Sequence, residues 1–200
     1  MKRLVLIACV VLASCSRSPA DEVALIRGAD ALAWDGKHQV AGHRFREFPA
    51  TLAGWNVAPA GNLMAFLPRR IFEDLGDLPQ NARTPRPVGD VIINIGDART
   101  PDVMWNALQP LEPSGEFAGL KRFVSRAPGV VAPGDTLVLP APYKGHVQCG
   151  AGVLSSKAAS CNVTLTHDGL RHSFTITVDQ IQTWREYVES YLRVASLLEA

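Results

Sequence analysis

Residues 161–178 read CNVTLTHDGLRHSFTITV, and this stretch decides the fold that the sequence predicts. Asp168-Gly169 at its centre is a strong signal for a β-hairpin, because a two-residue type I′ turn needs positive φ at both positions. With these two residues as the turn, the register separates apolar from polar side chains almost completely. One face carries Cys161, Val163, Leu165, His167, Leu170, His172, Phe174, Ile176 and Val178. The other carries Asn162, Thr164, Thr166, Arg171, Ser173, Thr175 and Thr177.

A helix is expected directly after this hairpin. Asp179 followed by Gln182 is a capping-box pattern at a helix start. The next apolar side chains recur at three- and four-residue steps and form one stripe along a helix that runs to near Glu199: Ile181, Trp184, Val188, Tyr191, Leu192, Ala195 and Leu198. This stripe can pack on the apolar face of the hairpin. The sequence therefore predicts an α+β fold, an antiparallel β-rich domain with a C-terminal amphipathic helix packed on the sheet.

Short strands separated by turns are expected in the middle of the chain. The runs 41–48, 63–67, 91–95 and 136–139 are each bounded by turn residues, and 71–78 favours a helical turn. The prolines between these runs exclude long helices and central strands there.

The chain opens MKRLVLIACVVLASCSRSPA, which is typical of an export signal. Lys2 and Arg3 precede an apolar run, 4–12, that is too short to span a bilayer core of about 30 Å as a helix. Leu-Ala-Ser-Cys at 12–15 resembles the bacterial lipobox, in which the cysteine is lipidated and becomes the mature N-terminus. The alternative is an ordinary secreted protein that is cut nearby.

Lipidation of Cys15 would divide the chain into three parts. These are a removed signal peptide (1–14), the lipidated cysteine and its tether (15–21), and a single globular α+β domain (22–200). No other apolar stretch approaches the length of a membrane span, so the expected anchor is the N-terminal lipid alone. Ser16 follows the cysteine. By resemblance to enterobacterial lipoproteins, this implies an outer-membrane protein that faces the periplasm.

Only two of the four cysteines would remain for the folded domain. Cys9 leaves with the signal peptide and Cys15 carries lipid, so Cys149 and Cys161 are left in an oxidising compartment. We predict that they form a disulfide that closes a small loop. The hairpin register places Cys161 on the apolar face, so Cys149 is expected on a neighbouring strand near 145–149. The alternatives are two free thiols or a metal site.

Composition and charge exclude several classes of protein. Hydrophobic residues make up 47% of the chain, which is too apolar for a disordered protein. The formal net charge is +1, and loss of Lys2 and Arg3 with the signal peptide lowers it to −1. This near-neutral balance argues against a nucleic-acid partner held by overall charge.

The sequence contains no recognised catalytic motif. GxSxG, HExxH, a P-loop, GxGxxG and CxxC are all missing from it, so we assign no catalytic residue and no cofactor. The alternative is an enzyme with an unrecognised site, which would need a polar pocket that gathers several of His38, His43, His146 and Asp97.

Two further patterns could indicate chemistry. His38/His43 and His167/His172 have the same H-x4-H spacing and could hold zinc if the two segments met, although ordinary polar side chains explain them as well. His-Val-Gln-Cys at 146–149 could place a thiol beside a base, which the predicted disulfide argues against. We assign no metal ligand.

A candidate contact surface follows the strand predicted at 91–95. The stretch NIGDARTPDVMW (94–105) is loop-like, and Arg99, Met104 and Trp105 are candidate partner contacts. The alternative is that Met104 and Trp105 fold back into the core.

The arrangement of the chain resembles that of the immunity lipoproteins that protect bacteria from type VI secretion lipase effectors. The similar features are the lipidated Cys15, the late cysteine pair, and Trp184 with Tyr187 in DQIQTWREYVESY (179–191). The resemblance covers mainly the ends of the chain and carries no toxin-contact residues over. It implies a stoichiometric, non-catalytic inhibitor whose partner is a lipase effector. The alternative is a housekeeping lipoprotein that binds an envelope-assembly machine or the cell wall.

Overall fold

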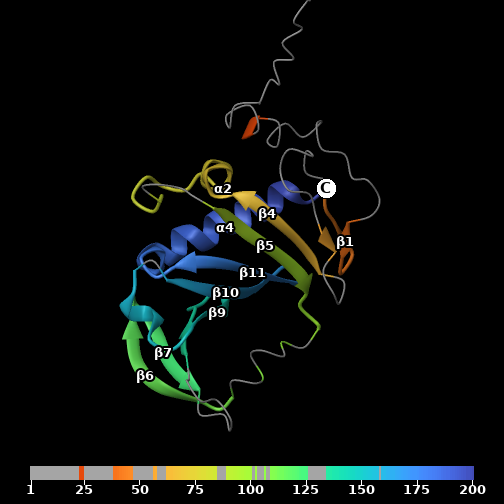
Figure 1. The fold of residues 1–200 in the computed structure, drawn as a ribbon. Coiled ribbons are helices and arrows are strands. Elements are labelled where there is room, and N and C mark those ends of the chain that lie inside the picture. Colours follow the sequence, from red (N-terminus) through yellow and green to blue (C-terminus); the bar gives the residue numbers. More distant parts are fainter. Residues whose placement is uncertain are drawn as a thin grey trace, which may run out of the picture.

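One antiparallel sheet organises the chain in the computed structural model (Figure 1). The structure describes residues 23–24, 38–46, 56–57, 62–84, 89–100, 102, 106, 109–125, 134–157 and 159–200. Nine strands of this described part form the sheet, in the order β3 (Asn56–Val57), β4 (Leu63–Pro68), β5 (Asp90–Asp97), β11 (Leu170–Thr177), β10 (Ser160–His167), β9 (Lys144–Cys149), β8 (Asp135–Val138), β7 (Leu120–Ser125) and β6 (Leu111–Phe117). A separate pair consists of β1 (Gln39–Val40) and β2 (His43–Arg44).

The hairpin predicted from 161–178 is confirmed in its exact register. Asp168 and Gly169 have φ values of 48° and 76°, as a type I′ turn requires. His167 pairs with Leu170 and Cys161 pairs with Ile176. Buried side chains alternate with half-exposed ones along β11, so one face belongs to the core.

The predicted α+β architecture is confirmed by the C-terminal helix. The 3-10 helix η4 (Gln180–Thr183) leads into α4 (Trp184–Leu198), which packs on the apolar face of the sheet. The rings of Phe174 and Tyr191 stack with their centroids 4.0 Å apart. The opposite side of α4 meets α2 (Arg69–Leu75), where Phe72 stacks on Tyr187 at 5.8 Å. Tyr187 lies outside the predicted stripe and is buried because α2 supplies this second contact.

Two local predictions are wrong. A single strand was expected over 41–48, but Ala41-Gly42 forms a turn between β1 and β2 with φ values of 51° and 92°. The expected capping box of Asp179 and Gln182 is also not formed, and the side chain of Asp179 caps a nearer backbone N–H instead. Asp179 accepts a hydrogen bond from the backbone N–H of Gln180, the first residue of η4.

The remaining predicted strands are present, together with one hairpin that the sequence did not predict. The runs 63–67, 91–95 and 136–139 correspond to β4, β5 and β8, and the helical turn expected at 71–78 overlaps α2. The additional hairpin joins β6 to β7 through a turn at 118–119 with φ values of 51° and 74°. Pro113 lies in β6, which is an edge strand of the sheet. A proline is tolerated in an edge strand because such a strand pairs on one side only.

The predicted disulfide is present. Cys149 in β9 and Cys161 in β10 are direct cross-strand partners with their Cα atoms 4.4 Å apart. Both side chains are buried in the core. The bond consumes the thiol of Cys149, which removes the proposed Cys149–His146 nucleophile pair.

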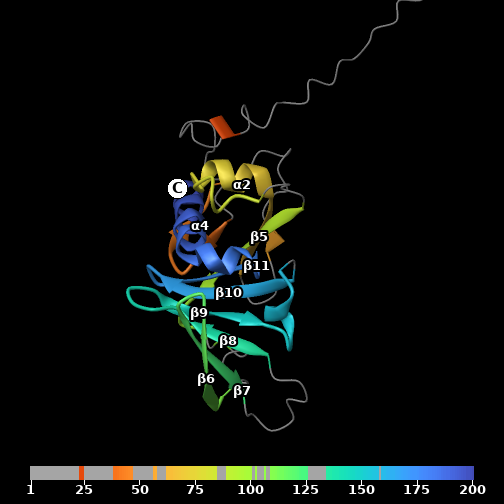
Figure 2. The ribbon, with the colours of Figure 1, turned by 90° about the vertical axis from the view of Figure 1, so that its left-hand side faces the viewer.

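The described residues of the connection from β5 to β6 lie against one face of the sheet, where Arg99, Thr100, Asp102 and Asn106 adjoin side chains of β8 to β11. β5 lies beside β11, whereas β6 lies at the far edge, six strand spacings or about 29 Å away. Residues 98–110 can span this distance because they reach about 44 Å when fully extended. The chain then returns strand by strand from β6 to β11 (Figure 2). We call the face away from α4, which carries Thr164 and Arg171, the outer face.

Candidate binding groove

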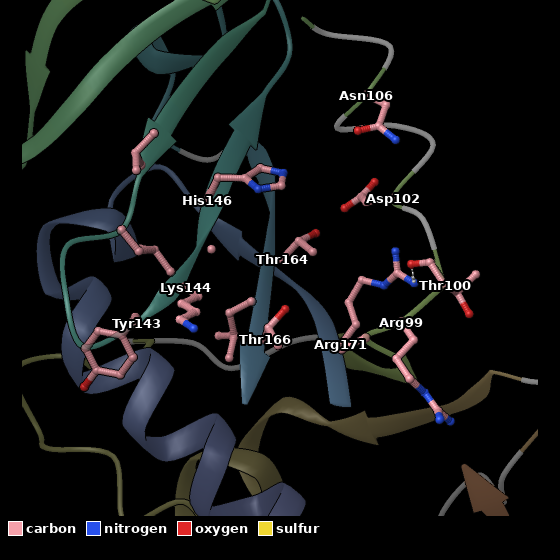
Figure 3. Close-up of a pocket in the computed structure, with 15 residues that line it drawn as sticks. Arg99, Thr100, Asp102, Asn106, Tyr143, Lys144, His146, Thr164, Thr166 and Arg171 are labelled. Atoms are coloured by element: carbon pink, nitrogen blue, oxygen red, sulfur yellow. Dashed lines mark hydrogen bonds between the residues drawn. The ribbon is translucent and has the colours of Figure 1, made fainter. Parts of the chain in front are cut away.

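A groove of about 600 Å³ lies on the outer face, beneath the connection that follows β5 (Figure 3). Its volume lies within the range of about 300–1,000 Å³ found for ligand sites. Strands β8 to β11 form its floor, and the described residues of the connection form one wall. Its polar lining consists of Arg99, Thr100, Asp102, Asn106, Tyr143, Lys144, His146, Thr164, Thr166 and Arg171.

The floor of the groove is built from rows of cross-strand partners. Thr166 of β10 pairs with Lys144 of β9 on one side and with Arg171 of β11 on the other. Thr164 pairs with His146 in the next row. Because direct partners in an antiparallel sheet point to the same face, both rows project into the groove. The register of the central hairpin therefore positions the floor.

Arg171 holds the start of the connection in place. Its Nη2 atom donates hydrogen bonds to the carbonyl oxygens of Asp97 and Thr100, at 3.0 and 2.7 Å. The Asp97 carboxylate accepts three hydrogen bonds from the Arg99 guanidinium, two from Nε at 3.0 and 3.1 Å and one from Nη2 at 2.7 Å, and a further one from the Arg99 backbone N–H at 2.8 Å. These bonds lower the pKa of Asp97 to about 2. The wall is therefore tied to the sheet by charged side chains.

His146 is the most deeply buried titratable group of the lining, with 7% of its surface exposed. Burial lowers its pKa, and the negative charge of Asp102 opposes this shift. The imidazole is therefore neutral near neutral pH. A general base also needs a nucleophile within reach. Thr164, the strand partner of His146, carries a hydroxyl, but this hydroxyl is hydrogen-bonded to that of Ser173 at 3.2 Å.

The structure places only some of the candidate residues at the groove. Arg99 is at its rim with 80% of its side chain exposed, whereas Met104 and Trp105 lie outside the described residues. Of the residues that an enzyme pocket was expected to gather, His146 lines the groove and the carboxylate of Asp97 is bound by Arg99.

Sequence reasoning missed Lys144, Tyr143 and Asn106 as groove residues. It assigned Thr164, Thr166 and Arg171 to the polar face of the hairpin, which is correct. The sequence could not predict that described residues of the β5–β6 connection lie against this polar face. The contact joins residues that are far apart in the sequence, so no local pattern indicates it.

A second, smaller hollow of about 80 Å³ is lined by one histidine pair, His167 and His172, and by Glu199. His43 is hydrogen-bonded to Glu199 at 2.6 Å, and the rings of His167 and His172 are 6.4 Å apart. The described residues contain no group of three or more His, Cys, Asp or Glu side chains suited to hold a metal ion. Nor does the described part of the chain contain a helix long and apolar enough to cross a membrane.

Comparison with known proteins gives one distant likeness. No protein-family model and no curated protein matches the sequence. A similar solved structure is that of Smlt3025, an immunity protein of the Stenotrophomonas maltophilia type IV secretion system. It is 11% identical, with a TM-score of 0.48 over 81% of this chain and 92% of that chain. At this distance the likeness assigns neither a family nor a function to the present chain.

Proposed function

We propose that this protein is a lipid-anchored, periplasm-facing binding protein that acts without catalysis, and specifically an immunity protein that blocks a type VI lipase effector. The observation that carries the binding role is the preformed polar groove on the outer face. Its floor is a hydrogen-bonded sheet and its wall is held by Arg171, so little ordering is needed when a partner binds. A rigid site of this kind favours tight, stoichiometric binding.

The cellular role rests on the sequence. The lipobox at 12–15 supports attachment through Cys15 on the periplasmic side of the envelope. The effector class rests on the arrangement of Cys15, the cysteine pair and the Trp-bearing terminal helix. A lipid-anchored inhibitor would be concentrated at the membrane, where a lipase finds its substrate.

The test is protection against a type VI lipase effector, which is sought first among the genes beside this one. The effector is directed to the periplasm of a host that does or does not make the full-length protein, and survival is counted. We expect survival to be restored, a stable complex to co-purify, and the lipase activity of the purified effector to fall in proportion to added inhibitor. An effector without its catalytic nucleophile is the control and should be harmless in both hosts.

Absence of both protection and a complex would refute the immunity role. The housekeeping alternative predicts a different pattern, a growth or envelope defect on deletion of this gene in pure culture. The two functions are therefore separated by whether the phenotype needs the effector.

A further inference from the structure

Two cationic side chains on the groove floor form no salt bridge with a carboxylate among the described residues, although the charge of Arg171 contributes to the lowered pKa of Asp97. The exposed ammonium group of Lys144 makes no hydrogen bond or ion pair within this part of the chain. Arg171 uses only Nη2, for two carbonyl oxygens, so its Nε and Nη1 are unused in the same region. The nearby Asp97 carboxylate is already bound by Arg99.

Among the other arginines of the described residues, Arg83 and Arg122 are paired with carboxylates, whereas Arg193 donates to the carbonyl oxygen of Gly76 and Arg69 to the hydroxyl of Tyr187. Arg83 contacts Asp74 at 2.5 Å and Arg122 contacts Asp135 at 2.6 Å. Charged groups that serve only to stabilise a fold are usually paired in this way when they are partly buried. Bonding to neutral oxygens is therefore shared by Arg171 with Arg69 and Arg193, and what distinguishes Arg171 and Lys144 is their place on the floor of the groove.

These two cations lie along one row of the groove floor, on the two strands that flank β10. Lys144, Thr166 and Arg171 form one row across β9, β10 and β11, with the Thr166 hydroxyl between the two cations. Two cross-strand steps separate the Cα atoms of the cations by about 10 Å, and the Arg171 guanidinium points toward Thr100 (Figure 3). A guanidinium and an ammonium placed around a hydroxyl fit a carboxylate.

We propose that this row binds a carboxylate from an acidic segment of the protein partner. The inference rests on the proposed function and names the chemistry of its partner. Asp102, in the connection, lies near His146 of the other row, so the groove has a cationic part and an acidic part. A segment with a Glu or Asp at the cationic part matches this charge pattern.

A polypeptide fits the site better than a membrane surface does. Anionic lipids are held by clusters of about four to eight basic residues on an accessible face. The row has two cations, and it lies at the floor of a groove that is walled by the β5–β6 connection. The chain as a whole is near neutral.

The experiment measures the Kd of the full-length lipoprotein for the effector by isothermal titration in detergent, at low and high salt. Lys144→Glu reverses the charge of an exposed side chain, and Lys157→Glu makes the same change at an exposed position away from the groove. We expect Lys144→Glu to weaken binding by about ten- to a hundredfold and to reduce its salt dependence, while Lys157→Glu changes Kd by less than about twofold. Near-UV circular dichroism of each variant checks the fold, and Lys144→Gln is the milder replacement.

A partner-free arm keeps the inference separate from the proposed function. Hexaglutamate, hexalysine and vesicles of phosphatidylcholine with phosphatidylglycerol are added to the isotopically labelled full chain. We expect hexaglutamate alone to shift the amide signals of Thr166 and Arg171, and Lys144→Glu to abolish the shift.

The outcomes separate the two proposals. If the effector binds and Lys144→Glu binds as tightly as the wild type, the carboxylate site is refuted and the immunity role stands. If no effector complex forms but hexaglutamate shifts the row, the immunity role fails and the carboxylate site is supported. A response to vesicles in place of hexaglutamate overturns the inference in favour of a lipid headgroup. No response in either arm refutes both.

Discussion

His172 makes the stability of the fold depend on pH, with a sign that its surroundings determine. Its side chain lies on the core face of β11 with 3% of its surface exposed, and its ring packs edge-on against Tyr191 at 5.6 Å. Nδ1 has no hydrogen-bond partner. Burial, with smaller contributions from His167 and His43, lowers the pKa to about 4, although a hydrogen bond to the backbone of His167 and the charge of Asp168 act in the opposite direction.

The size of the effect follows from this pKa. An unfolded histidine titrates near 6.5, so between about pH 6.5 and pH 4 the unfolded chain binds more protons at this site than the folded one. The folded state therefore loses stability as the pH falls. With these two pKa values, His172 should cost about 2 kcal/mol between about pH 7 and pH 5, and about 3 kcal/mol by about pH 4.

The assay is urea unfolding of the oxidised wild type and of His172→Phe at several pH values in this range. The phenylalanine ring retains the contact with Tyr191 and cannot titrate. We expect the free energy of unfolding of the wild type to fall by about 2 kcal/mol more than that of the variant between about pH 7 and pH 5. The readout is the pH dependence, so any constant loss of stability in the variant cancels. Parallel curves for the two proteins would refute the reasoning, because they would mean that the buried imidazole titrates as in the unfolded chain.

Three further predictions concern the disulfide, the close strand packing and the anchor. Replacing Cys149 and Cys161 together by serine should lower the free energy of unfolding by about 3 kcal/mol, since the bond closes a short loop, and the mature wild type should show no reactive thiol when denatured without reductant. Gly145→Ala should lower the melting temperature far more than Gly150→Ala, because a Cβ at Gly145 would lie 2.3 Å from a carbonyl oxygen of β10, whereas at Gly150 its nearest contact is 3.3 Å away. Cys15→Ser should move the protein from the membrane fraction to the soluble periplasmic fraction, and an unchanged distribution would contradict lipidation.

Local signals explain why the C-terminal part of the fold could be predicted. Asp168-Gly169 specifies its turn chemically, and the alternation on both sides admits only one register with a continuous apolar face. The spacing of the stripe then orients α4 on that face. Each of these signals is carried by residues close together in the sequence.

The β6–β7 hairpin lacks such local signals and was not predicted for that reason. Its turn at 118–119 is Ala-Gly, which lacks the side-chain chemistry of Asp-Gly although it adopts the same positive φ angles. Pro113 and the irregular pairing between Pro113 and Gly115 hide the alternation of β6. Context from β7 therefore fixes a strand that propensity alone disfavours.

The groove was beyond sequence reasoning for a different reason. Threonine and serine on the outer face have the same pattern whether that face meets water or another segment. The structure distinguishes the two cases through His146 and Thr136, which are buried although they lie on the polar face. His146 lines the groove together with Asp102 and Asn106 of the β5–β6 connection, whose described residues cover it.

The disulfide connects the predictable part of the fold to the unpredictable site. A slip of β9 by one residue against β10 would turn Lys144 and His146 toward the core and replace them on the outer face by Gly145 and Val147. The bond between Cys149 and Cys161 forbids this slip because the two cysteines are direct partners in the ladder. The covalent link therefore fixes which side chains of β9 face the groove, in addition to closing a loop. A small buried feature of the core thereby determines the charge pattern that a partner would meet on the opposite face of the sheet.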